Sequence, residues 1–264
     1  MKKRGPAELL LGGSLLVGAI GSWWGGLSDG AWIDEVISLE TAALPWPELL
    51  ARTAFGDVHP PGYYTLLKGW ALVGGGGELA GRGLSLCLVA AALWVLVDHG
   101  RRHLSLLQAA LLGVLFASCP LVAHYATEIR SYGLLLLLAT VGLVLVHRLE
   151  RSPEERTTVP GLCLVVASLV WTHYFGWILV ALLVMTTLLR LPPGRRSVHR
   201  WTLVGLSALA ASSCWLVVVL VQIRHLPSRP SLWANRPSRT PPPHKRRYGT
   251  SSRPLRPLTA RRRR

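Results

Sequence analysis

Residues 132–148 read YGLLLLLATVGLVLVHR, and this stretch decides the fold class. It contains no Asp, Glu, Lys or Arg before Arg148. A helix that crosses a bilayer needs about 20 predominantly apolar residues, so the stretch is predicted to be a membrane span. Comparable runs occur on both sides of it, at 8–27, 79–98, 104–123, 159–174, 175–190 and 201–223. We predict an all-α, multi-pass transmembrane helical bundle of about seven spans, with six as the main alternative because the pair 159–174 and 175–190 is short.

The composition supports this prediction and divides the chain into two parts. Half of the residues are hydrophobic and 16% are charged, which is too apolar for an ordinary soluble domain. The net charge of +16 is concentrated in residues 224–264, which hold 13 of the 29 Lys and Arg and no acidic residue. The first 223 residues hold 16 basic and 13 acidic residues, so the body is nearly neutral. We therefore predict a transmembrane domain at 1–223, and we expect no nucleic-acid partner.

The basic tail at 224–264 is rich in Pro and Arg and has almost no aliphatic run. Three interpretations compete. The tail is a disordered segment that touches anionic lipid or nucleic acid, a genuine outer segment, or the product of a shifted reading frame or a truncated gene near residue 238. We favour the third, under which residues 239–264 are not native sequence, because the composition changes so abruptly.

The basic residues orient the spans. The triplet at 2–4 precedes the first run, so the positive-inside rule places the N-terminus in the cytoplasm. Counted from there, the basic loops near 101–102, 148–156 and 195–200 all fall on the cytoplasmic side. This agreement supports the span count, because one miscounted helix would move the later basic loops to the opposite side of the membrane. The first run lacks a small-x-small cleavage site before Trp23, so we predict an uncleaved anchor.

Residues 28–78 form the largest predicted loop on the opposite, outer face. The segment 36–55 is predicted to be an amphipathic helix at the membrane interface, broken at its two prolines. A second helix is predicted at 61–73 with proline at its N-terminal end, and the glycines at 74–77 free the chain to enter the next span. Tryptophans typical of a membrane–water boundary accompany these helices: Trp32, Trp46 and Trp70.

Polar side chains from three separate segments gather on this predicted outer face: Asp34, Glu35, Asp57, His59, Glu128, Arg130 and His173. Ionisable groups near a membrane are costly, so their convergence is a functional-site hypothesis. Together they offer a general base, metal ligands and a phosphate clamp. Each also has a simpler interpretation: acids that start a helix, a rigid His-Pro-Pro turn, a solvated ion pair or a core histidine. The shared face, rather than any single residue, carries the hypothesis.

Two motifs lead to a family resemblance. Ile33-Asp34-Glu35 follows the first run, and GDVHPPGYY occupies 56–64. With further motifs at 78–85, 118–132 and 172–176, they resemble the membrane GT-C glycosyltransferases of family 39, the dolichyl-phosphate-mannose–protein mannosyltransferase and aminoarabinose transferase type. The resemblance covers roughly residues 8–238. Departures are Gly62 where leucine is usual, Thr127 and Ile129 where Gln and Ala are commoner, and a shorter length than the family's, which suggests truncation.

The resemblance implies a GT-C-like fold, a sugar donor on a polyprenyl phosphate, a protein or glycan acceptor at the outer face, and a bacterial inner membrane. Asp34 would be the base with Glu35 beside it, and Arg130 would hold the phosphate, since its planar fork matches phosphate oxygens. The resemblance assigns substrate or phosphate binding to Asp57, His59, Glu128, Arg130, Tyr132 and His173. No cofactor is certain, and a divalent cation at Glu128, His173 or His59 stays open because metal dependence varies among relatives.

Two functions from different classes follow. The leading one is a glycosyltransferase that uses a lipid-phosphate sugar, with an inactive truncated enzyme as one form of it. The alternative is a non-catalytic multi-pass protein, a transporter or an assembly subunit, that binds a ligand at its outer face. A transporter typically places ionisable residues near the middle of the membrane. In this sequence they gather at one interface, which favours the enzyme.

Overall fold

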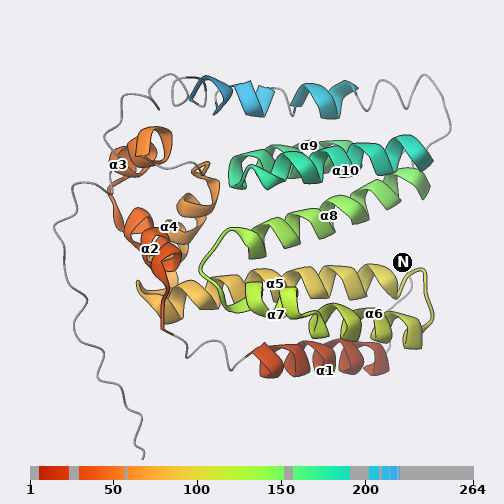
Figure 1. Cartoon of the computed structure of the whole chain (residues 1–264). Helices are drawn as coiled ribbons and strands as arrows, with labels where there is room; N and C mark the ends of the chain where they lie inside the picture. The colour runs from red at the N-terminus through yellow and green to blue at the C-terminus, as the bar shows by residue number, and fades with distance from the viewer. Residues whose placement is uncertain are drawn as a thin grey trace, which may run out of the picture. The chain divides into compact units, whose positions relative to one another are not determined.

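The computed structural model describes residues 6–23, 30–56, 59–151 and 157–190, together with 202–207, 210–213, 215–218 and 220. The regular structure in these ranges is entirely helical, which confirms the all-α prediction for them (Figure 1). Asp57 and the tail lie outside the described residues. The labelled elements are α1 (Pro6–Trp23), α2 (Ile33–Ala43), α3 (Trp46–Ala51), the π-helix η2 (Arg52–Gly56), α4 (Gly62–Gly74), α5 (Glu78–Gly100), α6 (Leu106–Ser118), α7 (Pro120–Thr127), α8 (Tyr132–Arg151), α9 (Thr158–Thr172) and α10 (Phe175–Arg190).

Two of these helices, α5 and α8, are long and apolar enough to cross a membrane. The pair α6 and α7 qualifies as a third span if it is taken together, although it is bent by 63°. Shorter apolar helices lie at Gly13–Trp23, Thr158–Thr172, Phe175–Thr187 and Thr202–Val218. The described part therefore has two or three candidate spans, which suggests a membrane protein. Helices occur in all seven predicted runs, and the count of seven spans stays a prediction.

The predicted span 104–123 is not one straight helix. α6 ends at Ser118, Cys119 is extended with φ −66° and ψ 121°, and Pro120 begins α7. Proline has no backbone N–H to donate, and its ring disfavours helical geometry in the residue before it. The structure therefore corrects the prediction of a continuous helix here. The segment also starts later than predicted, after Ser105, whose side chain caps α6 by accepting a hydrogen bond from the Gln108 N–H.

The central helix of the bundle is α5, which contacts α1, α4, α6, α7 and α8. Val89 and Leu93 of α5 belong to one buried cluster with Trp23 of α1. Gly133 lets α8 approach α5 closely, because a Cβ at this position would lie 3.4 Å from the Ser85 carbonyl oxygen. Small residues at helix contacts are typical of membrane bundles. On its other side α8 packs against α9 and α10, as Figure 1 shows.

The loop between α1 and α5 folds into α2, α3, η2 and α4. The predicted helix breaks at Pro45 as expected, since α2 ends at Ala43 and α3 begins at Trp46. The predicted break at Pro47 is wrong, because Pro47 lies in the first turn of α3, where a helix tolerates a missing N–H. The second predicted helix is α4. α2 packs against α4, and both contact α5. Lys68 Nζ of α4 donates to the carbonyl oxygens of Ala42 and Leu44 at 3.2 and 2.6 Å, which holds the C-terminal end of α2. Protein contacts therefore fix α2, the helix that carries Asp34.

The chain reverses between α9 and α10 at His173 and Tyr174, as predicted, and Gly176 permits the reversal. A Cβ on Gly176 would collide with the Leu169 backbone carbonyl.

We expect Gly176→Ala to lower the free energy of unfolding by about 1–3 kcal/mol, because backbone atoms must move to admit the methyl group. Thermal unfolding in detergent micelles measures the change. Gly83→Ala is the matched control, since a Cβ there meets nothing within 4 Å, and an equal loss in both variants would contradict the steric argument.

Candidate functional site

The predicted base and the predicted phosphate ligand meet in the structure. Asp34 lies in the first turn of α2, and Arg130 lies in the short link between α7 and α8. Arg130 Nη2 is 3.7 Å from Asp34 Oδ2, and the two side chains are 11% and 35% exposed, respectively. This distance is an ion-pair contact rather than a tight hydrogen bond. The arrangement therefore combines a half-exposed carboxylate with a guanidinium that still has donors to offer an anion.

Glu35 occupies a different environment from its neighbour Asp34. Its carboxylate is buried and accepts two hydrogen bonds from Arg82, from Nη2 at 3.0 Å and from Nε at 3.4 Å. The backbone N–H groups of Ile129 and Trp32 donate to the same carboxylate at 2.9 and 3.2 Å. A buried charge is stable only when it is paired and hydrogen-bonded in this way. The geometry favours a structural role for Glu35, and its predicted catalytic role stays a prediction.

The Glu35 contacts also explain how the Asp34–Arg130 pair is positioned. Asp34 precedes Glu35 in the chain, and Arg130 follows Ile129. The Glu35 carboxylate therefore ties α2 to the α7–α8 link at the residues next to both members of the pair, and Arg82 anchors it to α5. Arg82 is the residue that the sequence patterns did not single out as a partner. A signal was present, because an arginine inside a predicted membrane span calls for a buried partner.

Glu128 is the first residue of the same α7–α8 link and is also buried. Its Oε2 is 3.4 Å from Nε2 of the exposed His124, and its backbone carbonyl accepts a hydrogen bond from the Ser85 hydroxyl at 2.5 Å. Burial raises the pKa of Glu128, and the nearby carboxylates raise it further, whereas His124 and Arg130 lower it. Burial therefore favours the neutral form of the Glu128 carboxyl over its charged form.

Three side chains that the sequence predicts to bind substrate, His59, Tyr132 and His173, lie together beside the Asp34–Arg130 pair. The His59 and His173 ring centroids are 4.8 Å apart, and those of Tyr132 and His173 are 5.6 Å apart. His173 is buried, and its Nδ1 accepts a hydrogen bond from the Phe175 N–H at 3.0 Å, which leaves Nε2 to carry the proton of the neutral ring. A small cavity of about 10 Å³ borders both Arg130 of the ion pair and His59 of the ring group. Its lining residues are Ser38, His59, Pro60, Tyr63, Tyr64, Arg130, Ser131 and Thr172.

The structure thus brings Asp34, Arg130, His59, Tyr132 and His173 to one end of the described bundle, with Glu128 next to them. Asp57 is a predicted member that lies outside the described residues. The predicted cation ligands Glu128, His173 and His59 do not form a three-ligand group in the described ranges. Such a group occurs instead at His99, His103 and His147, which the sequence patterns did not single out.

The site supplies, within one small volume, a carboxylate to accept a proton, a guanidinium to hold an anion, and ring faces to hold a flat or apolar surface. This combination suits group transfer from a phosphate-linked donor, and it would equally bind an anionic ligand without chemistry. Comparison of the chain with protein-family models, with curated proteins and with solved structures finds no match.

Proposed function

We propose that the chain is a membrane glycosyltransferase that moves a sugar from a polyprenyl-phosphate donor to an acceptor hydroxyl at the outer face of the membrane. The observation that carries the proposal is the 3.7 Å contact between Arg130 Nη2 and Asp34 Oδ2. These side chains come from segments far apart in the sequence, and they are the two chemical groups that the reaction requires. The family resemblance of the motifs around them supports the same function.

In the proposed reaction, Asp34 takes the proton of the acceptor hydroxyl as that oxygen attacks the anomeric carbon of the sugar. A new carbon–oxygen bond forms while the bond from the anomeric carbon to the phosphate oxygen breaks. The electron pair of the broken bond leaves with the polyprenyl phosphate. Arg130 stabilises the negative charge that develops on this phosphate, and its two parallel N–H groups suit the phosphate oxygens.

The neighbouring side chains support substrate binding in this proposal. The partly exposed rings of His59 and Tyr132 offer surfaces against which a sugar can lie, with polar atoms at their edges for its hydroxyl groups, and the buried His173 packs against both. The cavity beside them has room for about one water molecule. A donor headgroup therefore enters only if side chains such as Arg130 and Asp34 move apart.

The proposal is tested by sugar transfer in membranes that contain the full chain, with radiolabelled sugars on polyprenyl phosphate as donors. We expect Arg130→Gln to lower the transfer rate by about 10²-fold or more, because the leaving phosphate loses its cationic partner. Arg130→Lys keeps the positive charge but loses the planar pair of N–H donors, so its transfer rate should fall between those of the wild type and Arg130→Gln. The matched control is Arg52→Gln, which removes a more exposed arginine paired with Glu40 at 3.7 Å.

The outcomes separate the two candidate functions. Transfer that is unchanged in Arg130→Gln would contradict the phosphate role of this residue. If the wild-type chain transfers sugar from none of the donors but still binds a polyprenyl phosphate, the non-catalytic alternative replaces the enzyme. Wild-type transfer that falls in Arg130→Gln and persists in Arg52→Gln would support the proposal.

A further inference from the structure

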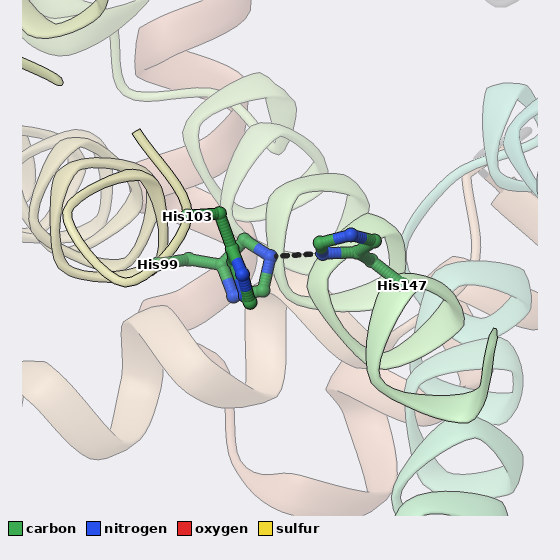
Figure 2. A group of neighbouring side chains, drawn as sticks. All are labelled: His99, His103 and His147. Carbon is green, nitrogen blue, oxygen red and sulfur yellow. Dashed lines mark hydrogen bonds between the residues drawn. The ribbon is translucent and has the colours of Figure 1, made fainter. Parts of the chain in front are cut away.

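A cluster of three histidines lies at the C-terminal ends of α5 and α8 (Figure 2). His99 is in the last turn of α5, His103 is in the turn that follows, and His147 is in the last turns of α8. Their ring centroids are 4.6 to 4.8 Å apart, and one nitrogen from each ring lies within 4.8 Å of the others. The cluster is about 25 Å along α5 from Arg82, at 1.5 Å per helical residue, and is therefore separate from the proposed transfer site.

The hydrogen bonds of the cluster leave one ring nitrogen unsatisfied. Arg151 Nε donates to His147 Nε2 at 3.0 Å, so a neutral His147 carries its proton on Nδ1. This proton is shared with His99 Nε2, which is 2.6 Å away, and a neutral His99 then carries its own proton on Nδ1. That nitrogen is buried and has no hydrogen-bond partner among the described residues. A buried unpaired donor costs about 1–3 kcal/mol, and it stays on Nδ1 when Nε2 binds an ion. The metal site is therefore argued from the convergence of the three rings, each of which places a nitrogen within 4.8 Å of the others.

We propose that His99, His103 and His147 form a binding site for a divalent transition-metal ion of the zinc class. Imidazole nitrogens bind Zn²⁺, Co²⁺, Ni²⁺ and Cu²⁺, whereas Mg²⁺ and Ca²⁺ prefer oxygen ligands. Three histidines leave the fourth position of a tetrahedral ion open. A cavity of about 390 Å³ borders the three rings and is lined mostly by apolar side chains of α5, α6 and α8, so this open position has room for water or a small ligand.

The closest pair of ring nitrogens needs only a small movement to accept an ion. Zinc–nitrogen bonds of about 2.0–2.1 Å place two ligand nitrogens roughly 3.3 Å apart at the tetrahedral angle. His99 Nε2 and His147 Nδ1, now 2.6 Å apart, would separate by about 0.7 Å as the ion replaces their shared proton. The C-terminal ends of α5 and α8 both direct partial negative charge toward this region, which favours a cation.

Arg151 opposes the ion in two ways. Its positive charge repels a cation, and its hydrogen bond occupies His147 Nε2. When His147 binds the ion through Nδ1, its remaining proton moves to Nε2, and Arg151 must release that nitrogen. Arg151 is exposed, so its side chain can turn into solvent. Further charged groups nearby are Asp98, Arg101, Arg102 and Arg148, and Asp98 forms ion pairs with Arg101 and Arg102.

The test uses the full chain purified in detergent without a polyhistidine tag and stripped with a chelator. Co²⁺ is titrated while its visible absorption is recorded, and Zn²⁺ is then added to displace it. We expect one tetrahedral Co²⁺ per chain, displaced by Zn²⁺. His147→Ala should weaken binding by about 10²-fold, because losing a ligand costs at least as much as losing a supporting contact. His103→Ala should weaken it as well, and the exposure of this side chain means that its removal leaves no cavity in the core.

Two further variants make the result specific. Arg151→Gln is expected to tighten Co²⁺ binding, whereas a general loss of structure would weaken it. His124→Ala removes an exposed histidine elsewhere and should leave the affinity unchanged. Binding of equal strength in the wild type and in the His99→Ala/His147→Ala double variant would overturn the proposal, as would weaker binding in Arg151→Gln. The readout is metal binding alone, so a negative result would overturn the metal site and leave the proposed sugar transfer unaffected.

Discussion

Replacing Asp34 with asparagine is expected to lower sugar transfer by about 10²–10⁴-fold, the usual contribution of a general base. Asparagine has nearly the same shape as aspartate but cannot take the proton of the acceptor hydroxyl. It also removes the charge that faces Arg130 Nη2 at 3.7 Å, so the guanidinium stays available for the donor phosphate. The effect should therefore appear in the rate at saturating donor rather than in donor affinity. Transfer of labelled sugar over a range of donor concentrations measures both.

The control for Asp34→Asn is Glu48→Gln, which neutralises an exposed acid in the first turn of α3. Both variants should insert into the membrane and unfold at nearly the same temperature as the wild type. An Asp34→Asn variant that keeps the wild-type rate would show that another group accepts the proton. Glu128 would then be the next acid to replace, because it lies within the same site.

Breaking the buried Glu35–Arg82 pair is expected to lower the free energy of unfolding by about 3–5 kcal/mol. Arg82→Met leaves the Glu35 carboxylate with the N–H groups of Ile129 and Trp32 but without its counter-charge. Glu35→Gln leaves the Arg82 guanidinium buried without the carboxylate that balances its charge. In each case the charge that remains is buried and has lost the opposite charge it is paired with. Chemical or thermal unfolding in micelles measures the loss for each single variant.

The Glu35→Gln/Arg82→Met double variant completes a cycle that isolates the interaction between the two side chains. Its loss should be smaller than the sum of the single losses, because no uncompensated charge remains. The Arg102–Asp98 pair provides a matched control: its closest contact is 2.7 Å and Arg102 is 45% exposed. Removing that pair should cost no more than about 1 kcal/mol. Losses of equal size at the two pairs would contradict the role assigned to burial.

Local sequence patterns predicted the helices well, because apolar runs and prolines act over short distances. The reversal at His173, the break at Pro45 and the start of α4 after Pro61 all follow from such patterns. The bend between α6 and α7 was missed although Pro120 marked it. The apolar run continues across the proline, so a prediction from hydropathy alone joined two helices into one.

The candidate site was predicted in part. Hydropathy and the positions of basic residues were enough to assign Asp34 and Arg130 to the same predicted face of the membrane. The pairing of Glu35 with Arg82 was not predictable in the same way, because it joins α2 to the first turns of α5 and depends on how these helices rotate about their axes. The histidine cluster was missed for the same reason. His99 and His103 share a helical spacing, but only packing of α8 against α5 adds His147.

The Glu35 carboxylate gives Asp34 and Arg130, the two groups proposed to react, freedom that a direct bond would not allow. Backbone positions at Asp34 and Arg130 are fixed through Trp32, Ile129 and α5, so the spacing of the two segments does not depend on attraction between their side chains. In the proposed reaction, their 3.7 Å contact opens to admit the donor phosphate while the main chain stays in register. The site is in this sense preorganised: the buried Glu35–Arg82 pair supplies rigidity, and the partly exposed Asp34–Arg130 pair supplies adaptability.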